Sequence, residues 1–149
     1  MKFDRRLTDE IYTSDTVRLG KNAFQAMRET IYHNGGVGTI TGYYDAELSI
    51  LSVSDLLLHN LNHSYASLME QTKGSLKNLF YKKDAAFLDN ARFRQIKGEG
   101  EGRVLTADGS PVYVRLYKKD AVDTDGTPIW IMSVQTVSYT HLRAHETDS

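Results

Sequence analysis

The chain has 149 residues, of which 40% are hydrophobic and 25% charged, a composition typical of one folded domain. Eighteen Lys and Arg residues nearly balance nineteen Asp and Glu residues, so the formal charge of −1 argues against a nucleic-acid partner. The chain has no cysteine, which excludes disulfides and thiolate zinc clusters and suits the cytoplasmic location that we predict. No run of about 18 apolar residues occurs, so the sequence predicts no membrane segment.

Two amphipathic helices are expected in the first 33 residues. Apolar residues recur at helical spacing in two sets: Phe3, Leu7 and Ile11, then Val17, Phe24, Met27 and Ile31. The second helix can begin at a Ser14-Asp15 cap and is expected to end at Gly35-Gly36. We interpret residues 1–33 as a helical cap or connector that packs on a sheet or on the same helix of a second chain.

The middle of the chain predicts a β-hairpin followed by helices. Two β-rich runs, residues 37–44 and 48–53, flank a turn, and three short helical segments follow at 55–61, 65–71 and 76–81. Asp84 can then cap a longer helix that carries Phe87 and Ile96. We interpret the run GEGEG, residues 98–102, as the stop of that helix, because a phosphate loop would precede a helix and would not carry two glutamates.

The last third predicts three antiparallel strands. An Asp108-Gly109 turn joins residues 103–106 to PVYVRLYKK, and Asp125-Gly126 leads into PIWIMSVQ. Both faces of PIWIMSVQ carry apolar residues, so both are expected to be covered. The fold class is therefore α+β, with one five-stranded antiparallel sheet, short helices on one face and an N-terminal amphipathic helix.

Two stretches resemble the PAS family of sensory domains. They are VSDLLLHNLNHSYASLMEQTKGSLKNLF, residues 53–80, and VLTADGSPVYVRLYKKDAVDTDGTPIWIMSVQ, residues 104–135. The second is more specific, because it is similar to the three closing strands of the family, with an Asp-Gly turn and a D-x-x-G-x-P pattern. We take residues 34–136 as the PAS-like domain. The chain departs from the family where residues 62–65 lack a glycine and where the usual Asp-Ile-Thr ending is missing.

The end of the chain resembles something other than a protein. Residues 137–147, VSYTHLRAHET, are similar to the translation of a transposase adapter used to prepare sequencing libraries. We therefore expect residues 137–149 to be a non-native tail, and the natural chain to continue beyond Thr136 into an output domain that is lost here. The alternative is a metal site formed by His141 and His145, which lie four residues apart. We predict no metal site.

The sequence contains residue types that catalyse reactions in enzymes, but not in the spacings of known catalytic motifs. The sequence has no G-x-S-x-G elbow, no P-loop and no evident carboxylate pair, so we predict no catalytic residues and no enzyme activity. His59 and His63 lack a third ligand at a suitable spacing, and we assign them surface or turn roles. The resemblance argues against two cofactors of the family. Haem would need a histidine on the predicted helix 84–97, and a cysteinyl flavin would need a cysteine.

The resemblance implies a cavity between sheet and helices that can hold a small ligand. The candidates to line it are Ile40, Leu57, Leu61, Phe80, Phe87, Val114, Trp130 and Met132. A filled core is the alternative. The candidates for a cap helix or a dimer contact are Phe24, Met27 and Ile31.

The expected function is that of a sensory module in a bacterial signalling protein, a homodimer whose lost output domain is a histidine kinase or a diguanylate cyclase. It would sense a small ligand or relay a conformational change through its terminal helices. One alternative is a PAS domain that binds nothing and only pairs subunits. The other is a small cone-shaped α+β enzyme that uses a buried Asp and Tyr.

Overall fold

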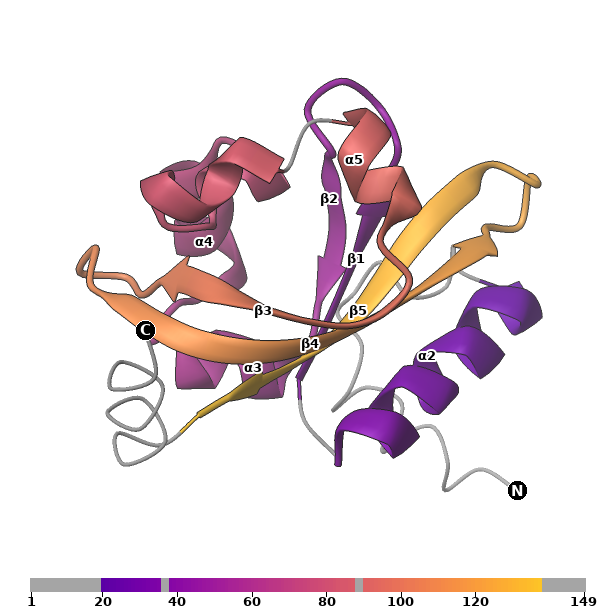
Figure 1. The fold of residues 1–149 in the computed structure, drawn as a ribbon, viewed down its shortest axis with the longest axis horizontal. Coiled ribbons are helices and arrows are strands. Elements are labelled where there is room, and N and C mark those ends of the chain that lie inside the picture. The colour runs from indigo at the N-terminus through magenta and orange to yellow at the C-terminus, as the bar shows by residue number, and fades with distance from the viewer. Residues whose placement is uncertain (1–19, 36–37, 88–89, 138–149) are drawn as a thin grey trace.

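The computed structural model describes residues 20–35, 38–87 and 90–137 (Figure 1). The elements follow one another as a helix, two strands, a series of short helices and three strands. Their bounds are α2 Gly20–Asn34, β1 Gly38–Tyr43, β2 Ile50–Val53, α3 Asp55–Asn60, α4 Tyr65–Thr72, η2 Leu76–Asn78, η3 Lys82–Phe87, α5 Asn90–Gln95, β3 Gly98–Leu105, β4 Pro111–Val122 and β5 Pro128–Thr136. None of the helices in these ranges is long and apolar enough to cross a bilayer.

The strands form one five-stranded antiparallel sheet, in the order β2-β1-β5-β4-β3. The predicted α+β fold class is therefore confirmed. The last strand of the sequence lies at the centre of the sheet, where β5 pairs with β1 from Gly38↔Val134 to Tyr43↔Ile129 and with β4 from Val114↔Thr136 to Val122↔Pro128. A central strand of this kind has neighbours on both edges and layers on both faces.

Helices cover both faces of the sheet (Figure 1). An inner apolar core lies between the sheet and the helices that follow β2, and Leu57, Leu68 and Phe93 are the helical residues at its centre. A smaller outer core lies on the other face, where α2 packs Ala23 and Met27 against β5. The prediction that both faces of PIWIMSVQ are covered is confirmed, since Trp130 belongs to the inner core and Ile131 to the outer one.

Side chains also join α2 to the sheet by hydrogen bonds. The Asn34 amide donates to the carbonyl oxygens of Arg115 and Ser133, at 3.1 Å each. The Ser133 hydroxyl donates to the Thr30 carbonyl at 2.8 Å. Because these groups are largely buried, each bond satisfies a polar atom that would otherwise be costly to bury. The position of α2 on the sheet is thus fixed at its C-terminal end by polar contacts as well as by packing.

The first hairpin differs slightly from its prediction. The predicted turn is present, with the Asp45 carboxylate accepting from the backbone N–H and the hydroxyl of Ser49, at 2.8 and 2.7 Å. Leu48 adopts a left-handed φ of +50°, so the second strand starts later than residue 48, at Ile50. The helices α3 and α4 begin at the predicted residues, Asp55 and Tyr65, and the Ser54 and Ser64 hydroxyls cap them by accepting from backbone N–H groups of their first turns.

Two predictions about residues 84–102 are wrong. The single helix expected over 84–97 is instead the short η3 and α5, with residues 88–89 outside the described part. The GEGEG run does not only stop a helix. It forms most of β3, which pairs with β4 from Gly98↔Lys118 to Leu105↔Pro111. Glycine has a low intrinsic preference for strands, but pairing with the long neighbouring strand overrides it. The strand expected over residues 103–106 is therefore longer and starts at Gly98.

Asp84 does not cap a helix. It lies within η3 and binds Arg103 of β3, accepting from the backbone N–H at 2.8 Å and from the guanidinium nitrogens at 3.0 and 2.7 Å. The Arg103 guanidinium also lies over the rings of Tyr81 and Tyr113. Instead of capping a helix, Asp84 makes a tertiary contact with Arg103 that holds η3 against the edge strand β3.

Three further predictions fall outside the described residues. They are the first amphipathic helix with Phe3, Leu7 and Ile11, the start of the second helix at Ser14-Asp15, and the histidine pair His141 and His145. The second helix itself is present as α2, beginning at Gly20 and ending before Gly35, which has a left-handed φ of +82° as the prediction of a glycine stop requires.

Candidate functional site

The predicted pocket residues gather in the inner core. Ile40, Val114, Trp130 and Met132 lie on strands, Leu57 and Leu61 lie at α3, and Phe80 follows η2; all are buried in one cluster. The side chain of Phe87 lies outside the described part of the chain. Sequence reasoning therefore located the inner face of the sheet correctly. Whether these residues contact a ligand stays a prediction.

Trp130 occupies the middle of this core. Its ring meets Phe93 of α5 edge to face, with the centroids 5.5 Å apart, and its indole N–H donates to the Tyr43 carbonyl at 2.9 Å. Gly42 makes this position possible, because a Cβ there would lie 2.2 Å from the Trp130 ring and from the Ser49 carbonyl oxygen. The large ring is fully buried and fills part of the space between the sheet and the helices.

Two small cavities lie in the inner core among the described residues. One of about 50 Å³ is bounded by α5 and β3 and reaches Phe93, Gly100 and Lys118. The other, about 10 Å³, lies between α3 and the sheet, where Leu57 and Leu61 face Met132. A water molecule occupies about 30 Å³ of liquid, whereas small-molecule pockets measure about 300 to 1,000 Å³. In this conformation the cavities are of the size of water, not of a metabolite.

Glycines on β3 leave room beside the larger cavity. Gly98, Gly100 and Gly102 alternate along the strand toward the inner face. A Cβ at Gly100 would meet no atom within 4 Å, whereas one at Gly102 would lie 3.0 Å from the Phe80 ring. The GEGEG run, interpreted from the sequence as a helix stop, is thus a strand that borders the inner core and places no side chain there at its glycines.

A buried lysine closes one end of that cavity. Lys118 of β4 is 2% exposed, and its ammonium donates to the Ile96 carbonyl at 3.0 Å, to the Asp120 carboxylate at 3.1 Å and to the Tyr44 hydroxyl. Tyr44 in turn donates to Asp120, which also receives a hydrogen bond from the exposed Lys97 at 2.7 Å. The three N–H bonds of the ammonium therefore have three acceptors.

Burial changes the acidity of this polar cluster. It lowers the pKa of the Lys118 ammonium below its ordinary value of 10.5, an effect that Asp120 offsets only in part. Burial, together with the hydrogen bond to Asp120, raises the pKa of the Tyr44 hydroxyl. Sequence reasoning missed this cluster, although the alternation that places Val114 and Leu116 inward places Lys118 inward as well.

The histidines and acids do not form a metal site in the described residues. His63 is buried at the turn between α3 and α4, where its Nδ1 is 2.6 Å from the Ser67 hydroxyl. Burial lowers the pKa of its imidazole. No group of three histidines, cysteines or acids in the described ranges could hold an ion together. The position of His63 between α3 and α4 is that of a turn residue, one of the two roles expected for it.

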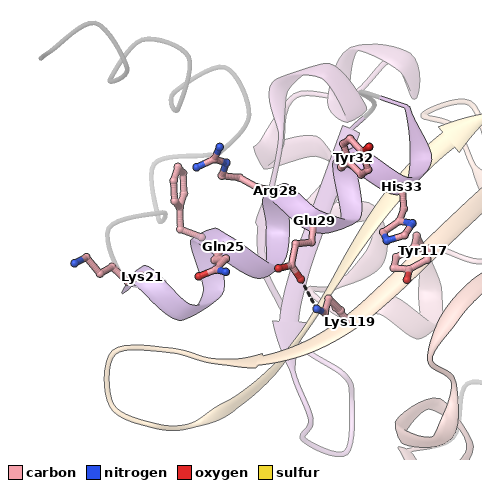
Figure 2. Close-up of a pocket in the computed structure, with 9 residues that line it drawn as sticks. Lys21, Gln25, Arg28, Glu29, Tyr32, His33, Tyr117 and Lys119 are labelled. Atoms are coloured by element: carbon pink, nitrogen blue, oxygen red, sulfur yellow. Dashed lines mark hydrogen bonds and ion pairs between the residues drawn. The ribbon is translucent and has the colours of Figure 1, made fainter.

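A groove on the outer face is the larger concavity. It has a volume of about 770 Å³ and runs between α2 and β4 (Figure 2). The α2 residues along it form two rows of spacing four: Lys21, Gln25, Glu29 and His33, then Phe24, Arg28 and Tyr32. Tyr117 and Lys119 line it from β4. We call this concavity the α2–β4 groove.

Aromatic rings and cations dominate the α2–β4 groove. Tyr32 is 85% and Phe24 36% exposed. The His33 ring stacks on Tyr117 with the centroids 4.3 Å apart, and Glu29 pairs with Lys119 (Figure 2). The hydrogen bond and charge of Lys119 hold the pKa of the Glu29 carboxyl below its ordinary value. Among the described residues that line the groove, Glu29 is the one carboxylate, so none is left there for Lys21 and Arg28.

The three cap-helix candidates divide between the faces of α2. Met27 is fully buried in the outer core and Ile31 packs beside it, so both contact the sheet. Phe24 is the exposed member and lines the groove. The spacing of four that relates Phe24 to Arg28 and Tyr32 was visible in the sequence, but the groove also needs Tyr117 and Lys119, whose place depends on how α2 lies across β4.

Comparison with solved structures identifies the fold. No protein-family model matches the sequence, and a search of curated proteins gives no match. The PAS domain of an HTR-like protein from Haloarcula marismortui is similar, with a TM-score of 0.54 at 15% identity, covering 76% of this chain and 97% of that one. The fold is that of a PAS domain. A light-oxygen-voltage domain, from work on its mechanism with a flavin analogue, is similar at a TM-score of 0.55 and 12% identity, covering 83% of this chain and 93% of that one.

The resemblance stated from the sequence is therefore confirmed at the level of the fold. In this PAS fold, the inner core lies between the sheet and the helices α3 to α5. Helix α2 lies on the opposite face of the sheet. At sequence identities of 12% and 15%, the similarity shows that the fold is shared and does not assign a role to any residue.

Proposed function

We propose that this chain is a signal-transduction module of the PAS type, carried by a larger bacterial signalling protein. The observation that supports the proposal is the position of β5. Trp130 and Met132 project from it into the inner core, while Ile129 and Ile131 project into the outer core under α2. Because close-packed side chains transmit displacement, a change in the inner core that moves β5 reaches α2 through direct contacts.

The input of the module acts on the inner core in this proposal. A cavity of about 50 Å³ admits a metabolite only if α5 and its neighbours move outward. Such a movement would break the contact of the Ile96 carbonyl with Lys118 and shift Phe93 against Trp130. A small ligand would thereby favour an open state over a closed one, which is how binding becomes a signal.

The output of the module lies beyond Thr136 in this proposal. A histidine kinase or a diguanylate cyclase, in the cytoplasm, is the output domain that we propose, and residues 137–149 are then a foreign tail. The test is to amplify the gene from its source and read across the codon for Thr136. New coding sequence for an output domain would support the proposal. A genome that encodes YTHLRAHETDS followed by a stop would contradict it.

A second candidate is a PAS domain that binds nothing and pairs subunits as a homodimer. The small size of the two inner cavities favours this candidate, as does the exposure of Phe24 and Tyr32 on α2. Native mass spectrometry of the purified protein separates the two. A retained small molecule supports the sensor, and a ligand-free dimer supports the scaffold. A ligand-free monomer contradicts the scaffold.

The relay from inner core to α2 has its own test. Gly100→Val adds an isopropyl group, three carbon atoms, beside the larger cavity, where a Cβ meets no neighbour within 4 Å. We expect it to change amide hydrogen exchange in α2, because pressure on the inner core is passed through β5. The matched control is Glu99→Val, which alters the next, outward residue of β3. Equal exchange in α2 for both variants would show that the faces are not coupled.

A further inference from the structure

The α2–β4 groove leaves large side chains of α2 in solvent between Phe24 and Tyr32. Tyr32 is 85% exposed at one end and Phe24 36% exposed near the other, and Arg28 lies between them with its guanidinium 5.8 Å from the Phe24 ring. Eight residues of helix span about 12 Å, which sets the length of this exposed stripe. A partner of matching length would cover it.

The charge of the groove indicates an acidic partner. Lys21, Arg28 and Lys119 line it, and one carboxylate, Glu29, pairs with Lys119. A partner that carries carboxylates beside an apolar stripe would complement both the rings and the two cations, Lys21 and Arg28, for which no second carboxylate lines the groove among the described residues.

The covalent connection of the chain leaves such a segment within reach of the groove. Gly20, the first residue of α2, has a left-handed φ of +73°, a conformation that does not continue a right-handed helix. Gly20 also lies against Thr124, because a Cβ on it would be 3.0 Å from the Thr124 methyl group. Residues 1–19, which lie outside the described part, thus join α2 next to Lys21, at one end of the groove.

The sequence of that segment matches the groove in length and charge. Phe3, Leu7 and Ile11 form one row of spacing four, which in a helix also spans about 12 Å. The segment also carries Arg5 and Arg6, but a helix would place Asp4 and Glu10 about 60° from the centre of this row and Arg6 and Arg5 farther away, at about 100° and 160°. We propose that residues 3–11 of this same chain dock as a helix in the α2–β4 groove, antiparallel to α2, with the apolar row on Phe24 and Tyr32.

Docking places Ile11 near Phe24 and Phe3 near Tyr32, because the chain must reverse between residue 12 and Gly20. Eight residues, 12 to 19, span up to about 26 Å when extended, which is ample for the reversal. The docked segment occupies the surface that a second copy would use. Pairing of subunits through this groove then requires release of the segment. This inference does not depend on the function proposed above.

Cross-linking of the full chain tests the proposal. The protein has no cysteine, so the two introduced thiols are its only thiols. We pair Leu7→Cys with Arg28→Cys and react them with a short bifunctional maleimide. The expected product is an internal link in a monomer, formed several-fold more efficiently than in the control Asp9→Cys with Arg28→Cys, since residue 9 is about 200° from residue 7 around a helix.

Each other product overturns the proposal. Equal yields from the two pairs would mean that the segment is not held in one orientation. A covalent dimer as the main product would mean that a second copy occupies the groove. Adding Asp4→Lys and Glu10→Lys to the first pair is expected to reduce its yield to that of the control, and an unchanged yield would remove the charge argument.

The unmodified protein gives a second measurement that does not depend on any variant folding. Amides of residues 7–11 are expected to exchange more slowly in the whole chain than in a free peptide of residues 1–19, because docking stabilises their helical hydrogen bonds. Exchange at the rate of the free peptide would overturn the proposal.

Discussion

The two faces of the sheet differ in how completely side chains cover them. The inner face is closed by aromatic and aliphatic side chains, with Trp130 and Phe93 in edge-to-face contact and two cavities of about 50 and 10 Å³ among the described residues. In the described part of the chain, one helix covers the outer face. Its buried residues beyond Met27 are small or polar, and beside it lies a groove of about 770 Å³.

The difference shows where the chain can change without unfolding. Every layer on the inner face is locked by side chains from several elements, so a change there affects the stability of the whole domain. Helix α2 is held by a short apolar stripe and by Asn34 at its end, so it can shift while the sheet stays intact. The following predictions test this contrast, from the largest expected effect to the smallest.

Trp130→Ala should have the largest effect. Removal of a fully buried aromatic ring costs about 3 to 5 kcal/mol, because neighbours collapse only partly into the space. Chemical denaturation followed by circular dichroism measures the loss. Tyr32→Ala, an exposed aromatic on the outer face, is the control and should change the free energy of unfolding by no more than about 0.5 kcal/mol. Similar losses for both variants would contradict the contrast between the faces.

Met27→Ala should have an intermediate and more local effect. Such truncations cost about 2 to 5 kcal/mol, and we expect the lower end because the outer core is small. Hydrogen exchange should become faster in α2 than in β5, since the helix loses its central anchor. The exposed neighbour Gln25→Ala is the matched control. If β5 exchanged as fast as α2, the helix would not be a separate unit.

Asp84→Asn should cost about 1.5 to 3 kcal/mol near neutral pH, since the Arg103 guanidinium would lose a charged acceptor. Hydrogen bonds from Arg103 lower the pKa of the Asp84 carboxyl below its ordinary 3.8. A carboxyl with a lowered pKa stabilises the fold above 3.8 and loses that contribution as pH falls through its folded pKa. The free energies of unfolding of wild type and variant should therefore become equal in acid. Glu99→Gln, an exposed carboxylate on β3, is the control; a constant gap at all pH values would contradict the assignment.

Lys118→Met should have the smallest effect at neutral pH and a distinct one in alkali. The folded pKa of Lys118 is lowered, so between it and 10.5 the unfolded chain binds more protons. Wild-type stability should then rise with pH in this window, by up to about 1.4 kcal/mol per unit. Lys118→Met should lack this rise, whereas Lys119→Met should keep it. Equal slopes for the two variants, measured by denaturation below pH 10, would contradict a buried titrating amine.

The strands and their faces could be predicted from the sequence because alternation is local. Val112, Val114 and Leu116 alternate with Tyr113 and Arg115, and this pattern alone gives the inner face of β4. The turns at Asp108-Gly109 and Asp125-Gly126 fix the ends of the strands. With the resemblance to the PAS family, this was enough for the fold class and for the residues that share the inner core.

What could not be predicted depends on contacts between distant segments. The glycines of β3 become a strand because β4 lies beside them, and Asp84 finds Arg103 rather than a helix end. The size of the inner cavities depends on how rings such as Trp130 fill the space. The α2–β4 groove needs the position of one element across another, which no local pattern encodes.

The central position of β5 also has a mechanical consequence. Its ladders with β1 and β4 run along most of its length on both edges. A chain that pulls on β5 along the strand axis would load both ladders in shear, so many hydrogen bonds must break together. A pull on Gly20 would instead peel α2 from the sheet one turn at a time, against far less resistance. Tension applied at the two ends would thus be absorbed by the helix before it disturbs the strand.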